Sequence, residues 1–145
     1  MVTMKVRWSI YVLVCCVLLC LTGCGSNKEA QRSVLRVGVV LYTQDDPFIN
    51  ALTDCLKEDL EDYETDSLKI IMTVRDGKND QKLQDEVVEE ILDAGCDILV
   101  VDLVDRTEPS NIIKMAKNEN IPVIFFNREP VREDLMQWDK LYYVG

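Results

Sequence analysis

The chain has 145 residues and carries 26 acidic against 16 basic side chains, which gives a formal net charge of −10, and it contains no histidine. Such an acidic chain is repelled by nucleic acid and by anionic lipid, so neither is expected as an electrostatic partner. Without histidine, a Ser-His-Asp triad and a histidine-based zinc site are both excluded. The composition therefore favours a binding protein over an enzyme or a metalloprotein.

Residues 1–23 have the pattern of a lipoprotein signal peptide. Two basic residues precede an apolar run from Trp8 to Leu21, which ends in Leu-Thr-Gly-Cys24. A basic start, a short apolar core and small residues before the cut are typical of secretory signals, and the run is shorter than the roughly 20 residues that span a bilayer. The sequence Leu21-Thr22-Gly23-Cys24 matches the bacterial lipobox. This match predicts that Cys24 is lipidated, for example with palmitate, and that the protein lies on the outer face of the cell membrane. A plain signal peptide and an uncleaved anchor are the alternatives.

Residues 24–34 are polar and without periodicity, and we expect them to form a tether between membrane and domain. Removal of the signal peptide and lipidation of Cys24 leave Cys55 and Cys96. The first is expected within a helix and the second just after one, with nothing local to bring them together. Two buried free thiols are therefore favoured over a disulfide.

From residue 35 onward, short apolar runs alternate with segments of helical periodicity. The runs predict buried strands at residues 35–41, 68–74, 98–103, 121–126 and 141–144. Helices are expected in the first three gaps between these strands. Strand and helix in alternation imply parallel pairing and right-handed crossovers, so the predicted fold class is α/β with a doubly wound parallel sheet and helices on both faces.

The apolar residues of each helix predict which side it buries. The first helix is expected to bury a stripe formed by Phe48, Leu52, Cys55, Leu56 and Leu60. The second is expected to begin at Asn79 or Asp80, to bury Leu83, Val87, Ile91 and Leu92, and to end at Gly95 in the left-handed conformation. The third is expected to open at residues 107–109 and to bury Ile112, Met115 and Ala116.

Ligands of open α/β sheets bind at the carboxyl ends of the strands. Three segments follow strands here, at residues 42–48, 102–105 and 127–130, and they offer carboxylates, an amide, an arginine and an aromatic ring. This set suits a polyhydroxyl ligand, because carboxylates and amides pair with hydroxyl groups and a flat ring covers a sugar face. Alternatively, Asp45 and Asp46 only cap the following helix.

A phospho-acceptor receiver domain that binds magnesium is a further alternative, with Asp102 or Asp105 as the acceptor. The export signal argues against it, since phosphotransfer partners are cytoplasmic. So does Asn127, which stands where receivers usually place Ser or Thr.

Several stretches together resemble a known family. They are Arg36–Val39, Tyr42 with Asp45–Phe48, Asn79–Gln81, Asp102–Asp105, Ile121–Pro130 with its FFNREP sequence, and the ending Tyr142–Gly145. On these, residues 35–145 resemble the amino-terminal lobe of the periplasmic galactose/glucose-binding proteins, within the type 1 periplasmic binding protein superfamily. The resemblance implies that the family's second lobe and its calcium loop would follow Gly145, so that no cofactor or metal is expected in this segment.

The resemblance also assigns roles to single residues. It implies that Asp46 hydrogen-bonds a sugar hydroxyl and that Phe48 stacks on the sugar ring. Asp102 stands where the family usually has an asparagine that contacts sugar, and an ionised Asp accepts but cannot donate, which puts galactose or glucose specificity in question. Asn127 and Arg128 lie on the same predicted rim and are further candidates.

The function favoured by these observations is a non-catalytic, lipid-anchored receptor for a monosaccharide of the galactose or glucose type. Its expected partners are an ABC permease and a chemosensory or sensor-kinase ectodomain. The chain ends at Gly145 without a closing helix, which predicts a fragment that binds sugar weakly by itself. A truncated or decayed gene product without independent binding is the alternative, followed by an exported adaptor or signalling lobe.

Overall fold

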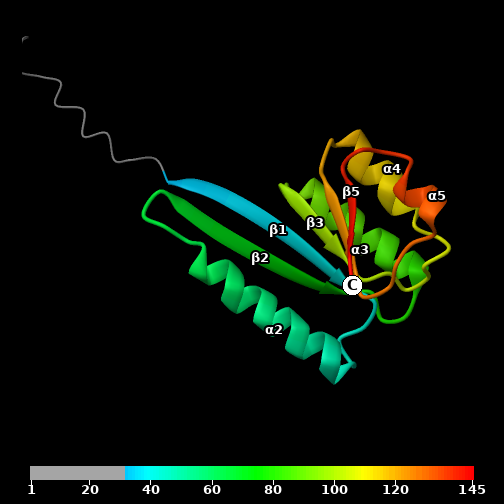
Figure 1. Ribbon diagram of the computed structural model, residues 1–145, viewed down its shortest axis with the longest axis horizontal. Helices are drawn as coiled ribbons and strands as arrows, with labels where there is room; N and C mark the ends of the chain where they lie inside the picture. The colour runs from blue at the N-terminus through cyan, green and yellow to red at the C-terminus, as the bar shows by residue number, and fades with distance from the viewer. Residues whose placement is uncertain (1–31) are drawn as a thin grey trace, which may run out of the picture. The chain divides into compact units, whose positions relative to one another are not determined.

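The computed structural model describes residues 32–145. The predicted signal peptide, Cys24 and the tether up to residue 31 lie outside the described residues. The elements are β1 (Ser33–Leu41), α2 (Pro47–Asp62), β2 (Leu68–Asp76), α3 (Gln81–Asp93), β3 (Ile98–Val101), α4 (Ser110–Asn118), β4 (Val123–Phe126), α5 (Arg132–Leu135) and β5 (Leu141–Val144) (Figure 1). All five predicted strands are present, and the short helix α5 was not predicted.

The strands form one parallel sheet in the order β2-β1-β3-β4-β5. In the middle of the sheet, Val39 of β1 pairs with Val74 of β2 on one side and with Val100 of β3 on the other. Connections run from β1 outward to β2 and then back past β1 to β3, β4 and β5. The predicted doubly wound α/β fold is confirmed, and the reversal of strand order lies between β1 and β3.

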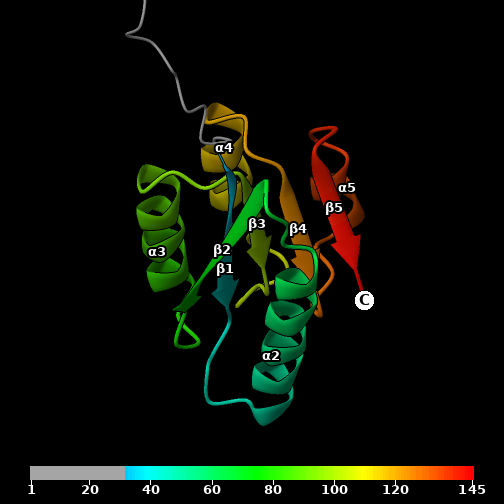
Figure 2. The same ribbon diagram turned by 90° about the vertical axis from the view of Figure 1, so that its left-hand side faces the viewer.

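Each face of the sheet has its own apolar core, and α2 covers one face while α3 and α4 cover the other (Figure 2). On the face of α2, Ile49 packs against Val39 and Leu41 of β1. On the opposite face, Ile112 of α4 packs among Val101 and Phe125 of the central strands. Because the strands are buried on both faces, they appear in the sequence as continuous apolar runs.

Helix α2 does not bury the stripe that its sequence predicted. Ile49 is 1% exposed and Leu56 and Leu60 are partly buried, whereas Phe48 is 66% and Leu52 is 40% exposed. Successive residues of a helix point about 100° apart. Because Ile49 packs against the sheet, the adjacent stripe that contains Phe48 and Leu52 is turned toward solvent. Cys55 lies on that stripe and is exposed, so the prediction of a buried thiol is wrong for Cys55.

On the opposite face, the sequence located the helix ends well. Asp80 caps α3 by accepting a hydrogen bond from the backbone N–H of Leu83, and Gly95 follows the helix with a φ of 82°. Cys96 comes next and is a buried free thiol, as predicted. The buried stripe of α3 also contains Gln84, which the apolar pattern missed. Helix α4 begins at Ser110, just after the predicted opening residues.

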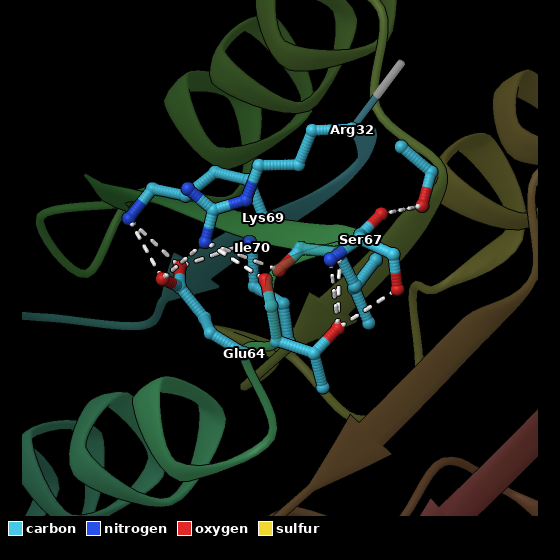
Figure 3. Close-up of polar contacts among 8 residues, drawn as sticks. Arg32, Glu64, Ser67, Lys69 and Ile70 are labelled. Carbon is cyan, nitrogen blue, oxygen red and sulfur yellow. Dashed lines mark hydrogen bonds and ion pairs between the residues drawn. The ribbon is translucent and has the colours of Figure 1, made fainter. Parts of the chain in front are cut away.

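The amino end of β1 is fastened to β2, as Figure 3 shows. The strand begins at Ser33, two residues before the predicted start, because the backbone N–H and the hydroxyl of Ser33 both donate to the carbonyl of Ser67. Arg32 donates to the carbonyl of Thr65 at 3.0 Å and lies 3.7 Å from the carboxylate of Glu64.

Glu64 joins this cluster to the edge of the sheet. Its carboxylate pairs with Lys69 at 2.8 Å and accepts the backbone N–H of Ile70 (Figure 3). These contacts, with the hydrogen bond from Lys69 first, lower the pKa of Glu64. The first described residues are therefore held against β2 at the end of the sheet opposite to the carboxyl ends of the strands. Within residues 32–145, no helix is both long and apolar enough to cross a membrane.

Candidate functional site

The candidate site lies where β1, β3 and β4 end. These three strands are neighbours in the sheet, so the loops after them meet at one edge. The loops carry Tyr42 and Asp46 after β1, Asp102 after β3, and Asn127 and Arg128 after β4. The fold thus brings together four of the five predicted sugar-binding residues, and Tyr42 joins them.

The carboxylate of Asp46 makes two kinds of contact: it caps helix α2 and it accepts a hydrogen bond from Tyr42 on the rim. As the N-cap residue of α2, it accepts the backbone N–H of Phe48 at 2.8 Å through Oδ1. Its other oxygen accepts the hydroxyl of Tyr42 at 2.5 Å. The hydrogen bond from Tyr42, followed by that from Phe48, lowers the pKa of Asp46. Asp46 therefore does cap α2, and its carboxylate is held ionised in a fixed orientation with lone pairs left for a ligand, so capping does not exclude the predicted sugar contact.

Arg128 connects the three loops. Its guanidinium lies 3.7 Å from the centre of the Tyr42 ring, a cation–π contact. The same group donates to the carbonyls of Leu103 and Val104, at 3.2 and 2.8 Å. Nη1 of Arg128 therefore binds the loop after β3 through two hydrogen bonds, and the stacking contact with Tyr42 binds the loop after β1. Arg128 is half-buried, and the N–H groups of its guanidinium other than those on Nη1 are available as donors.

Asp102 was predicted to lie on the rim surface, and this is wrong, since its exposed fraction is 0%. Its two oxygens accept from the side-chain N–H₂ of Asn127 at 3.2 and 3.0 Å. Burial raises the pKa of Asp102 to about 6, against the opposing effects of the Asn127 hydrogen bond and of Arg128. Asn127 itself is exposed and has a φ of 60°. At this point Asn127 is therefore the exposed residue and Asp102 the buried one.

Two glutamines of α3 bind the backbone of the loop after β3 through their side-chain amides. Gln84 is completely buried; its side chain donates to the carbonyl of Asp102 at 2.8 Å and accepts from the N–H of Val104 at 2.9 Å. Gln81 accepts from the N–H of Asp105 at 2.9 Å. Neither residue was predicted. The signal in the sequence is their spacing of three residues within the inward side of an amphipathic helix, where an amide needs buried partners.

Phe48 is the remaining predicted site residue. It occupies the first turn of α2, directly after the Asp46 cap, with 66% of its surface exposed. It belongs to neither of the two core clusters, and its exposed ring is accessible to a ligand. Asp105 is tied to Thr107 through its side chain, which lowers the pKa of Asp105.

The chemistry of this rim is that of hydrogen bonding to a neutral polar ligand. No three His, Cys, Asp or Glu side chains gather into a metal site within residues 32–145. Asp102 is buried beneath Asn127, so it offers no open carboxylate of the kind that a phospho-acceptor requires. A fixed carboxylate, an amide, a guanidinium and an exposed phenyl ring remain, and these groups pair with hydroxyls and cover an apolar ring face.

Comparison with known proteins identifies the family. The family model described as periplasmic binding protein domain matches residues 37–145. The D-galactose/methyl-galactoside binding periplasmic protein MglB of Haemophilus influenzae is 34% identical over 121 residues, which are 83% of this chain and 35% of that protein. The chain thus spans about a third of the length of this curated relative.

Solved structures share the fold. A solute-binding protein of an ABC transporter from Burkholderia multivorans superimposes with a TM-score of 0.65 at 18% identity, over 78% of this chain and 40% of that chain. The fructose-binding periplasmic domain of a hybrid two-component system is 25% identical, with a TM-score of 0.62 over 77% of this chain and 34% of that chain.

Proteins of this kind bind solutes without converting them, so the prediction of a non-catalytic protein is confirmed. The parallel sheet and the family match over residues 37–145 agree with the resemblance seen in the sequence, and the chain belongs to the type 1 periplasmic binding proteins.

Proposed function

We propose that this chain is the sugar-binding lobe of a solute-binding lipoprotein that delivers a hexose of the galactose or glucose type to an ABC permease. The observation that carries the proposal is the meeting of Asp46, from the loop after β1, with Asn127 and Arg128, from the loop after β4. The H. influenzae relative is a galactose-binding protein by name, which supports a hexose as the ligand.

The arrangement suits a sugar for a physical reason. A hydroxyl group both donates and accepts, so it pairs with the ionised Asp46 on one side and with a guanidinium N–H on the other. Both protein groups are already held by other residues, Asp46 by Tyr42 and Arg128 by backbone carbonyls, so little orientational freedom is lost on binding. Phe48 supplies the apolar surface for one ring face.

The proposed location is the outer face of the cell membrane, with the lipid on Cys24. The basic start, the short apolar run and the lipobox support this part of the proposal. An anchored receptor stays close to its permease without having to diffuse back to it. The fructose-binding neighbour belongs to a hybrid two-component system, which supports a sensor-kinase ectodomain as a second kind of partner.

Ligand binding is best tested on the full chain in non-ionic detergent by saturation-transfer NMR, which detects weak binding. We expect weak binding of galactose or glucose, in preference to xylose and ribose, because a single lobe covers only one side of the sugar. Asp46→Ala should abolish the signal. Absence of saturation transfer to all four sugars in the wild-type chain would contradict the proposed function.

Asp46 also caps a helix, so its variant needs a matched control. Asp80→Ala removes the equivalent cap from α3, at a similar cost of about 1 kcal/mol, without a contact on the rim. Retained binding in Asp80→Ala and lost binding in Asp46→Ala would separate the ligand contact from helix stability. Equal losses in both variants would show that the rim carboxylate has no direct part in binding.

The anchor is tested separately with Cys24→Ser in a bacterium that processes lipoproteins. We expect the wild-type chain to incorporate labelled palmitate and to sediment with membranes, and the variant to do neither. If the variant still sedimented with membranes and the wild-type chain incorporated no palmitate, the result would support an uncleaved anchor instead.

A further inference from the structure

The contact between Asp102 and Asn127 determines more than the position of a loop. Asp102 has no exposed surface, so a ligand cannot reach its carboxylate in this arrangement. Asn127 is exposed on the rim, at the end of β4. A buried ionisable group therefore lies directly beneath a side chain that a ligand can touch.

The carboxylate settles the orientation of the amide. An ionised carboxylate has only acceptors, so the side of Asn127 that faces it must be the N–H₂ group. Nδ2 indeed lies 3.0 and 3.2 Å from the two oxygens of Asp102. Since the amide is planar, its carbonyl oxygen Oδ1 then points away from Asp102. The backbone of Asn127 is held as well, because its carbonyl accepts the hydroxyl of Tyr143 at 3.3 Å.

No basic side chain competes for Asp102. Among residues 32–145, the ion pairs involve Glu64 and Glu86 but not Asp102. The charged groups that face it from neighbouring loops are Asp46 and Arg128. Arg128 is engaged with Tyr42 and with two backbone carbonyls of the loop after β3. The amide of Asn127 is thus the side-chain partner on which Asp102 depends.

We propose that Asp102 is a positioning residue that turns the carbonyl oxygen of Asn127 toward the ligand, so that the site selects a sugar offering a hydrogen-bond donor, a hydroxyl or an ammonium group, at that point. This inference rests on the proposed sugar-binding function and adds the polarity of one contact to it. An asparagine at residue 102 would accept either orientation of Asn127, because an amide presents both a donor and an acceptor. Asp102 removes that freedom.

The orientation is also sensitive to pH. A protonated Asp102 has one O–H donor, which can pair with the carbonyl oxygen of Asn127 and allow the amide to turn over. Burial raises the pKa of Asp102 to about 6, within the range that an exported protein meets. Below this pH the selection for a donor on the ligand should weaken, and above it the selection should be complete.

The first test needs no ligand. Side-chain N–H₂ signals of asparagine are followed by ¹⁵N NMR of the full chain in non-ionic detergent, and the Asn127 signal is assigned by its loss in Asn127→Ser. We expect this signal to shift with a midpoint near the Asp102 pKa of about 6 and to be independent of pH in Asp102→Asn. Asp105→Asn, which changes an acid of the same loop that contacts Thr107, should leave the titration intact. An Asn127 signal that does not titrate in the wild-type chain would overturn the proposal.

The second test measures selectivity. The sugar that binds the wild-type chain is compared with its singly fluorinated analogues, in which one hydroxyl becomes an acceptor without a donor. At pH 7.5 we expect one fluorinated position to weaken binding about tenfold, and Asp102→Asn to reduce that difference to about threefold or less. Equal discrimination in the two proteins would overturn the inference while leaving the sugar-binding function in place. Failure of the wild-type chain to bind any sugar would instead contradict the proposed function, and the NMR titration would still decide the role of Asp102.

Discussion

Burial of Asp102 makes a sharp prediction about stability and pH. Its pKa is about 6 in the folded chain and near 3.8 when freely solvated. Between these two values the folded state binds more protons than the unfolded state, so the free energy of unfolding falls as the pH rises from 4 through 6 and then levels off. At about 1.4 kcal/mol for each pH unit between the two values, the ionised carboxylate costs the folded state about 3 kcal/mol at pH 8.

Asp102→Asn removes the ionisation and keeps the shape of the side chain. Urea unfolding of the full chain in non-ionic detergent, followed by circular dichroism, gives the free energy of unfolding of variant and wild type at pH 4 to 8. The difference between them should change by about 2 kcal/mol in favour of the variant from pH 4 to pH 8, because part of the cost is already present at pH 4, and a constant offset from the new amide does not alter this change.

Asp105→Asn is the matched control, because hydrogen bonds from Thr107 lower the pKa of Asp105. Its stabilising effect is present above pH 4 and is lost only as the pH falls further, so its difference from the wild type should stay constant over pH 5 to 8. A constant difference for Asp102→Asn over the same range would refute the reasoning from burial.

Three further changes test the packing and the polar contacts. Gly38→Ala should lower the free energy of unfolding by about 1–3 kcal/mol in urea titrations, since a Cβ there would lie 2.3 Å from Cγ2 of Ile91. Gln84→Leu should cost about 2–5 kcal/mol by the same assay, because two backbone groups of the loop after β3 lose their buried partner; a neutral result would show that water replaces the amide. Glu64→Gln should destabilise the chain at pH 7 and match the wild type at low pH, because the lowered pKa of Glu64 makes its contribution present above pH 4.5 and lost as the pH falls.

The sequence was sufficient for the architecture because burial on two faces leaves a simple pattern. The buried part of β1, Val37–Leu41, and strand β3, Ile98–Val101, are continuous apolar runs, and such runs in alternation with amphipathic helices are typical of a covered parallel sheet. Helix ends were equally readable, since Asp80 and Gly95 act through local backbone geometry. These features depend on neighbours in the chain.

What the sequence could not supply depends on distant contacts. Helix α2 has apolar residues on two adjacent stripes, and only its contact with the sheet decides that Ile49 is buried while Phe48 and Cys55 are exposed. In the same way, an aspartate at the end of a strand looks like a rim residue. Asp102 is instead buried, and its carboxylate is bonded by Asn127, which is 25 positions further along the chain.

The fastening of Arg32 and Ser33 has a mechanical consequence. Any tension on the residues that precede them enters the domain at the amino end of β1, which pairs with β2 over nine residues and with β3 over four. A pull along this strand, about 30 Å long, loads its hydrogen bonds together and in shear instead of opening them one after another. The Arg32, Ser33 and Glu64 contacts at the same end resist the peeling that would begin such an opening. The proposed lipid on Cys24 would therefore pull on the lobe along β1, at the end of the strand opposite to the rim.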